Sequence, residues 1–204
     1  MEKGNQKLSK STQLYYKQII TERFIDNPRM SLLFDNKKKN FKKNVFNLVN
    51  YCFTIALKLD GVFIARNKKT IVLFYEKKKF KKTLVDHFNY LKVVKGIPLS
   101  NILKVLKNEK VVKKHQLKLD NFIYVWFIAQ QKGYGGIDGL NEINKMVTQI
   151  SKNTELPILF ETSDDKLLNL YSYGGFKVYK ELKRGEKTIY FLSNIDSIKQ
   201  KISS

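Results

Sequence analysis

Residues Phe122–Gly136 read FIYVWFIAQQKGYGG, and an amphipathic run, Ile137–Ile150, follows them directly. The first half of this stretch is an unbroken apolar run rich in β-branched and aromatic residues, which is typical of a strand covered on both faces. Gly133, Gly135 and Gly136 then allow backbone N–H groups to converge, because no Cβ atoms obstruct them. The stretch therefore predicts a buried strand, a glycine-rich loop and the start of a helix.

The start of such a helix presents unpaired backbone N–H groups, which bind anions well. Together with the glycine-rich loop, it predicts a site for a phosphate-bearing cofactor. The dinucleotide pattern G-x-G-x-x-G does not fit, because Asp138 occupies its third glycine position. The Walker pattern does not fit either, because no Gly-Lys-Ser/Thr follows the loop. The pattern that fits is Q-x-x-G-x-G, from Gln130 to Gly135.

A second motif follows later in the chain. The run Leu156–Thr162 (LPILFET) predicts a strand, Asp164–Tyr171 predicts a short helix, and Tyr171-Ser-Tyr-Gly-Gly-Phe176 leads into a strand at Lys177–Leu182. The first motif resembles the acetyl-CoA pyrophosphate loop of the GNAT superfamily of N-acetyltransferases, and the second resembles its Y-x-x-x-G-F signature. Both occur in the superfamily's order with the expected elements between them, so the resemblance is strongest over residues 122–192.

The rest of the chain is similar to this superfamily in the order of its expected elements. These are helices from Ser9 or Ser11 to Asn27-Pro28 and over Lys38–Lys58, a hairpin of Gly61–Ala65 and Thr70–Tyr75, helices over Lys78–Val94 and Leu99–Lys114, and a closing hairpin in which a turn at 183–187 leads into Thr188–Leu192. The resemblance implies an α/β (α+β) fold: a GNAT-like mixed, splayed β-sheet flanked by helices, with a helical insertion before the superfamily's fourth strand. We expect residues 1–204 to form a single GNAT-like acetyltransferase domain.

Composition narrows the class of protein. A hydrophobic content of 43% over 204 residues excludes a disordered chain. No apolar run approaches the length of a transmembrane helix, and the first residues lack the apolar core of a secretory signal, so we expect no membrane partner. Cys52 is the one cysteine, which excludes an internal disulfide and suits a reducing compartment; we therefore expect a cytoplasmic protein with Cys52 packed in a helix face.

The formal net charge of +21 could indicate nucleic acid or an anionic membrane as a partner. However, the basic residues are nearly all lysine, whereas readers of nucleic acid favour arginine. The lysine clusters also recur at separate places along the chain. We therefore interpret them as solvated surface that attracts an anionic cofactor. A basic nucleic-acid-binding protein on a GNAT-like scaffold remains the alternative hypothesis.

The resemblance implies where the cofactor binds. Backbone amides of the loop would hold the pyrophosphate of acetyl-CoA, and the edge of the preceding strand would pair with the pantetheine arm. Asp164 lies where the superfamily often has an Asn that contacts this arm, and an ionised acid cannot donate that hydrogen bond. Ser163 and Asn169 are the candidates to replace it. The expected cofactor-binding residues are Phe127, Ile128, Ala129, Gln131, Lys132, Gly133, Tyr134, Gly135, Gly136 and Asn169.

Two residues are candidates for catalysis. Tyr171 matches the superfamily's proton donor to the departing sulfur, with packing against the sheet as the alternative role. Glu161 ends a strand near the expected approach of the amine and could act as a base, directly or through a water; alternation along the strand puts it on the face opposite Phe160, so it could instead bridge the sheet. We expect Tyr173 to be structural. His87 and His115 lack partners at metal or triad spacing, so we expect them at the surface and expect no metal.

The resulting hypothesis is an acetyl-CoA-dependent N-acetyltransferase that acts on a primary amine by direct attack, as a monomer or homodimer. The acceptor could be a small amine, a polyamine, an aminoglycoside or a protein terminus, and the many lysines disfavour a polyamine. Two departures from the superfamily leave a catalytically inactive CoA-binding relative as a further alternative. The loop before Gln130 is shortened, and Ser172 and Tyr173 replace the basic residue that often follows the signature tyrosine.

Overall fold

The computed structural model describes residues 8–81, 83–184 and 187–196. Its elements are α1 (Lys10–Phe24), α2 (Pro28–Leu33), α3 (Phe41–Lys58), β1 (Val62–Ile64), β2 (Thr70–Glu76), the 3-10 turn η1 (Lys77–Lys79), α4 (Leu84–Lys95), α5 (Leu99–His115), β3 (Ile123–Gln130), α6 (Asp138–Thr154), β4 (Ile158–Thr162), η2 (Asp165–Leu167), α7 (Leu168–Tyr173), β5 (Lys177–Arg184) and β6 (Lys187–Ser193). Gly185 and Glu186 of the expected final turn lie outside the described residues, as do the first seven residues of the chain.

The strands form one six-stranded sheet in the order β1-β2-β3-β4-β6-β5. β3 and β4 are parallel neighbours, and the other neighbouring strands are antiparallel. The connection between the parallel pair is α6, as expected for a crossover of this kind. The sheet is therefore mixed, which confirms the fold class expected from the two motifs.

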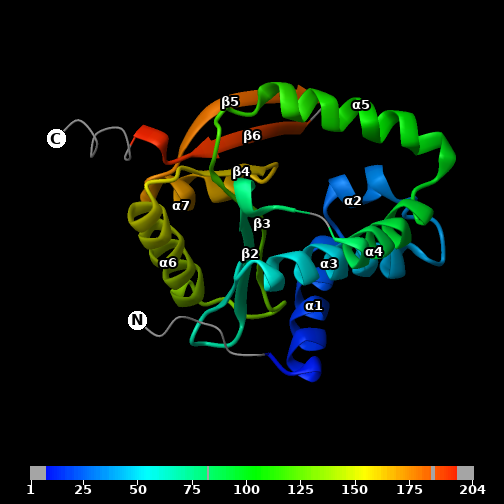
Figure 1. Cartoon of the computed structure of the whole chain (residues 1–204), viewed down its shortest axis with the longest axis horizontal. Helices are drawn as coiled ribbons and strands as arrows, with labels where there is room; N and C mark the ends of the chain where they lie inside the picture. The colour runs from blue at the N-terminus through cyan, green and yellow to red at the C-terminus, as the bar shows by residue number, and fades with distance from the viewer. Residues whose placement is uncertain (1–7, 82, 185–186, 197–204) are drawn as a thin grey trace.

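Helices cover both faces of this sheet (Figure 1). One face packs against α1 and α3 through a core that includes Ile20, Val49 and Phe53, all fully buried. The other face packs against α6 and α7, where Ile143 and Val147 meet Phe160 and Phe176. β3 contributes to both cores, so its dense apolar composition reflects burial on two sides, as the sequence predicts.

A β-bulge interrupts β3 at Trp126. Leu73 of β2 faces Phe127, whereas its neighbour Phe74 faces Val125, so Trp126 has no opposite residue. The extra residue shifts the alternation of the strand: Val125 packs toward α6, but Phe127 packs toward α1 and α3. As a result, Val125 and Ile128, three residues apart, line one cavity together.

Two expectations for the helices were wrong. The sequence predicts a first helix whose core-facing side carries Leu14, Tyr15, Ile19, Ile20 and Phe24. Leu14 and Tyr15 are instead 48% and 39% exposed, and Tyr16 packs against the core together with Ile19 and Ile20. The third expected helix was to begin at Lys78, but α4 begins at Leu84. Its start is set by a capping box in which the Thr83 amide and hydroxyl both donate to Asp86 Oδ2 at 2.7 Å.

Candidate active site

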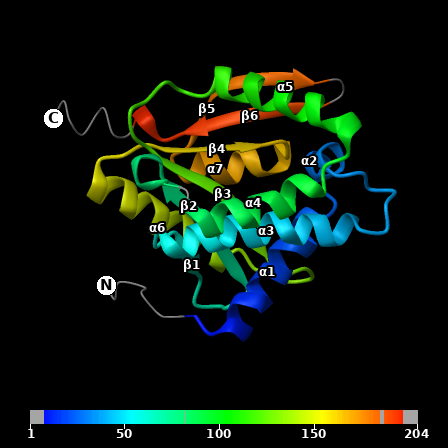
Figure 2. The same ribbon diagram turned by 45° about the vertical axis from the view of Figure 1, so that its right-hand side comes forward.

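The sheet opens between its two parallel strands. β3 and β4 pair only at their beginnings, where Ile123 faces Ile158 and Tyr124 faces Leu159. β3 continues to Gln130 and stays paired with β2, while β4 continues to Thr162 and stays paired with β6. A gap therefore widens toward the carboxyl ends of both strands (Figure 2). Along this gap the backbone of Phe127–Ala129 has no strand partner on the β4 side.

The glycine-rich loop lies at the wide end of the gap, between β3 and α6. Gln130 is still part of β3, and its side-chain amide donates to the carbonyl of Gly136 at 2.5 Å, which closes the loop on itself. Gly133 has φ +82°, a conformation that side chains disfavour, whereas Gly135 lies in open space. Among the described residues, the amides of Lys132, Gly133, Gly135 and Gly136 have no backbone acceptor. They are available to an anion.

Tyr134 and Asp138 lie over one side of this loop. The tyrosine hydroxyl donates to Asp138 Oδ1 at 2.8 Å, and Asn67 donates to the other carboxylate oxygen at 3.1 Å. The hydrogen bond from Tyr134 holds the pKa of Asp138 below its usual value, and the same bond raises the pKa of Tyr134. A permanent negative charge therefore lies at the start of α6 beside the expected phosphate site. The side chains cover Gly136 but leave Gly133 and Gly135 open.

Further contacts tie the loop to the region of α1. The Tyr15 hydroxyl donates to the side-chain oxygen of Gln131 at 3.2 Å, and the ammonium group of Lys132 lies 4.0 Å from the Asp26 carboxylate. The amide of Gln131 donates to the carbonyl of Lys69 at 2.8 Å. These contacts hold the backbone of the loop while leaving its glycines accessible.

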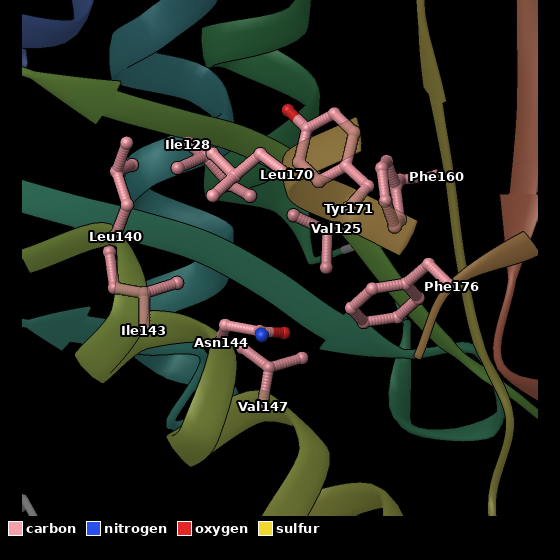
Figure 3. A pocket seen from close by; sticks show the side chains of 10 residues that line it. All are labelled: Val125, Ile128, Leu140, Ile143, Asn144, Val147, Phe160, Leu170, Tyr171 and Phe176. Atoms are coloured by element: carbon pink, nitrogen blue, oxygen red, sulfur yellow. The ribbon is translucent and has the colours of Figure 1, made fainter. Parts of the chain in front are cut away.

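An apolar cavity of about 40 Å³ lies beside the gap, between the sheet and helices α6 and α7 (Figure 3). Its lining comes from both strands and both helices: Val125, Ile128, Leu140, Ile143, Asn144, Val147, Phe160, Leu170, Tyr171 and Phe176. Asn144 is the polar exception on the α6 side of this lining. Its Oδ1 atom is buried and has no hydrogen-bond partner among the described residues.

Tyr171 lines the same cavity from α7. Its ring packs edge-on against Phe160, with 4.8 Å between the ring centroids. Burial, reinforced by the charge of Asp164 and opposed by that of Arg23, raises the pKa of Tyr171 to about 12. The phenol therefore stays protonated at neutral pH, but it is a weaker acid than a free tyrosine.

Glu161 lies on the opposite face of the sheet, as the alternation along β4 predicts. Tyr124 donates to its Oε2 at 2.5 Å, Gln116 donates to its Oε1 at 2.7 Å, and the Arg29 guanidinium lies 3.7 Å away. Burial, followed by the neighbouring Glu161 charge, raises the pKa of Tyr124 well above its usual value. The Glu161 side chain is only 3% exposed. Its contacts connect β4 to β3, α2 and the end of α5, and these contacts separate the carboxylate from solvent.

The remaining predicted residues are placed as follows. Asn169 is exposed on α7 and does not line the cavity, and Asp164 accepts a hydrogen bond from the Lys166 amide at the start of η2. Tyr173 was expected to be structural, but it is 92% exposed, so that expectation was wrong. His87 is exposed, as expected, whereas His115 is half-buried and stacks on Phe191. Cys52 is buried, and burial raises the pKa of its thiol, which suits an inert packing role.

Sequence reasoning missed Asn144, Tyr124, Arg29 and Gln116. Asn144 had a detectable signal, because it interrupts the apolar spacing of Leu140, Ile143 and Val147 on α6. The other three come from distant elements and meet Glu161 only in the folded chain. In the described part of the chain, no group of three or more His, Cys, Asp or Glu side chains could hold a metal, and no helix has the length and apolar character to span a bilayer.

No protein-family model matches the sequence, and the search of curated proteins found no match either. Solved structures match nearly the whole chain. The C-terminal condensation domain of Ebony, in complex with beta-alanyl-dopamine, has a TM-score of 0.60 at 9% identity and covers 90% of this chain and 93% of that one. A "histone acetyltransferase HPA2 and related acetyltransferase" from Corynebacterium glutamicum has a TM-score of 0.59 at 10% identity, covering 91% and 92%. Mosquito arylalkylamine N-acetyltransferase like 5b has a TM-score of 0.54 at 10% identity, covering 90% and 94%.

These likenesses confirm the fold that the two motifs predict. The chain has the mixed α/β fold of GNAT-type acetyltransferases, and helices α4 and α5 form the helical insertion expected before the strand that leads into the glycine loop.

Proposed function

We propose that this chain is an acetyl-CoA-dependent N-acetyltransferase that moves an acetyl group to a primary amine by direct attack. The observation that carries this proposal is the coincidence of three features at one place: a gap between parallel strands, open glycine amides at its wide end, and a cavity beside it that contains Tyr171. The GNAT-type acetyltransferase fold of the chain is consistent with this chemistry.

The residues of the site fit acetyl-CoA, which would supply the activated thioester. The free amides of Lys132, Gly133, Gly135 and Gly136 would hold its diphosphate, and each charge-assisted bond would contribute about 1.5–3 kcal/mol. The unpaired edge of Phe127–Ala129 would hold the pantetheine arm as an added strand does. Because the cavity has room for only a few waters, most of the arm would lie in the gap itself.

Asn144 would provide a polar contact to the pantetheine arm from α6. Its buried, unpaired Oδ1 can accept a hydrogen bond from an amide N–H of the pantetheine arm. Buried polar atoms in folded proteins nearly always have such a partner. We expect Asn144→Leu to weaken the binding of CoA about tenfold while leaving the binding of adenosine 3′,5′-bisphosphate, which lacks the arm, unchanged. Calorimetric titrations of both ligands measure this, with the exposed Asn141→Leu as control. Equal weakening for both ligands would contradict the assignment.

The catalytic groups would act from opposite faces of β4. Tyr171, on the cavity side, would donate its proton to the departing sulfur, and Glu161, on the α5 side, would accept a proton from the amine through a water. Both oxygens of Glu161 already accept hydrogen bonds. Gln116 or Arg29 would therefore have to move aside before a water could carry the proton of the amine to the carboxylate. We further propose one domain and a cytoplasmic location, which the buried lone thiol of Cys52 supports.

A titration with acetyl-CoA tests the proposal, using Gly135→Glu as the comparison. A Cβ at Gly135 meets no atom within 4 Å, so this variant should fold normally and place a carboxylate where the diphosphate is expected. We expect the wild type to bind acetyl-CoA and to release free thiol with a panel of primary amines, and the variant to do neither. Equal binding by both proteins would remove the loop from the proposed site.

A catalytically inactive CoA-binding protein is the second candidate. The raised pKa of Tyr171 favours it, because a phenol with a pKa of about 12 protonates a thiolate less readily than a free tyrosine does. Binding of acetyl-CoA without thiol release across the whole amine panel would favour this candidate over the enzyme.

A further inference from the structure

Helices α4 and α5 carry exposed apolar stripes. On α4, Leu84 is 81% exposed, Phe88 67% and Leu91 51%, and Val85 beside them is 63% exposed. On α5, Leu99 is 87% exposed, Leu103 77% and Leu106 56%. The spacing of three and four residues places each set on one side of its helix. In both views the two helices meet at one end of the molecule (Figures 1 and 2). We call these seven residues, with the lysines named below, the α4–α5 face.

This apolar surface does not contribute to the fold. α4 packs on α3 through the opposite side, where Val93 is buried and Tyr90 packs on Tyr51. α5 is held near its C-terminal end, where Gln116 donates to Glu161. Exposed leucine and phenylalanine side chains in such number are unusual on a monomeric protein and mark a surface that contacts something apolar.

The same surface is positively charged. Among the side chains that the structure describes on these two helices, the exposed lysines are Lys92, Lys95, Lys107, Lys110, Lys113 and Lys114. Asp86 of α4 is buried in its capping box, and no exposed acidic side chain lies on α4 or α5 among the side chains that the structure describes. Apolar stripes flanked by lysine are the pattern of helices that lie in the interface of a membrane.

We propose that the α4–α5 face binds an anionic lipid surface. Its leucine and phenylalanine side chains would enter the boundary between headgroups and acyl chains, and its lysines would pair with lipid phosphates. This binding is independent of the proposed enzymatic function. It goes beyond the expectation of no membrane partner, which considered only helices that cross a bilayer, and it gives part of the +21 net charge a role.

The other possible occupants fit this surface less well. A second copy of the chain would bring two sets of six lysines together with no acidic side chain of the described face to neutralise them. Nucleic acid would pair with the lysines but would leave the leucines unused, and neither helix contains the arginine that favours phosphate and base contacts.

Co-sedimentation with vesicles tests the proposal. The full chain should sediment with vesicles of phosphatidylcholine and phosphatidylglycerol in equal parts, and much less with phosphatidylcholine alone. Leu99→Ser/Leu103→Ser/Leu106→Ser should weaken this binding at least tenfold, because the apolar contacts are lost. Lys107→Glu/Lys110→Glu should weaken it about tenfold or more through charge. All these positions are exposed, so the variants should keep the wild-type circular dichroism spectrum.

Control variants change exposed residues elsewhere: Leu14→Ser/Tyr173→Ser for the apolar set and Lys42→Glu/Lys43→Glu for the charge set. Four results would overturn the proposal. They are absence of sedimentation, equal binding to both kinds of vesicle, loss of binding in the control variants as well, and a change from dimer to monomer by light scattering in the leucine variant without loss of lipid binding. A different result would assign the face to nucleic acid instead. In that case the protein would not bind vesicles, it would bind an oligonucleotide in a salt-sensitive way, and the leucine changes would leave this binding intact.

Discussion

Tyr171 and Glu161 occupy opposite faces of the sheet at the point where β3 and β4 separate. The alternation along the strand predicted the face on which Glu161 lies, and the Y-x-x-x-G-F signature singled out Tyr171 as a candidate. The sequence could not predict their surroundings, because the partners of Glu161 come from α2, β3 and α5. The raised pKa of Tyr171 likewise depends on burial that only the folded chain produces.

The variant Tyr171→Phe tests the proton-donor role at the scale of one residue. We expect acetyl-CoA to bind as before and the chemical step to slow by about 10²-fold, as for other proton-transfer groups. Because burial raises the pKa of Tyr171 to about 12, the wild type should lose no activity through this group as the pH rises from 7 to 10. Single-turnover rates across that pH range measure both effects. Wild-type rates in the variant would show that Tyr171 only packs against the sheet and does not donate a proton.

Asp138 permits a prediction with opposite signs for binding and stability. Its carboxylate suits the start of a helix but repels a diphosphate bound there. We expect Asp138→Asn to bind acetyl-CoA about two to five times more tightly while the unliganded protein unfolds at a lower temperature. Calorimetry gives the affinity and a thermal scan gives the midpoint. Weaker binding by the variant would show that the anion does not lie at this helix start.

At the scale of elements, local signals decided what could be predicted. The strand, loop and helix from Ile123 to Thr154 were predictable because a strand with both faces buried and an amphipathic helix each have a clear pattern in sequence. The late start of α4 was also encoded in the sequence, by Thr83 and Asp86 at capping-box spacing. The expected helix nevertheless began too early, at Lys78, because the lysine-rich segment before Thr83 was included in it. The bulge at Trp126 was not predictable, since it depends on the register between β2 and β3.

Asp86 is the residue that fixes the position of α4. Burial raises the pKa of Asp86, but hydrogen bonds from Thr83 and the ammonium group of Lys58 at 3.0 Å outweigh this and hold it below its usual value. We expect Asp86→Ala to lower the free energy of unfolding by about 1–3 kcal/mol at neutral pH. Because the folded-state pKa is depressed, this contribution is present above the unfolded pKa of about 3.9 and is lost as the pH falls through the folded value.

Urea denaturation of both proteins at several pH values measures this contribution. The difference between wild type and Asp86→Ala should be greatest at neutral pH and should shrink as the pH falls below about 4. A difference that stays constant down to acidic pH would contradict the ionic role of Asp86.

At the scale of the whole molecule, the net charge of +21 should attract anionic ligands over long distances. We expect the association rate of acetyl-CoA to fall by roughly tenfold between low and physiological salt, because screening shortens the reach of the field. The dissociation rate should change less, since it reflects contacts at the loop. Stopped-flow kinetics at several salt concentrations measure both rates, and an association rate independent of salt would mean that the lysines act only as solvated surface.

A crystal structure of the protein grown with acetyl-CoA tests the central claim most directly. We predict that the diphosphate lies on the amides of the loop at Gly133–Gly136 and that the pantetheine arm runs through the gap between β3 and β4, beside Asn144 and Tyr171. A cofactor bound elsewhere on the molecule, with the loop and the gap empty, would contradict the account.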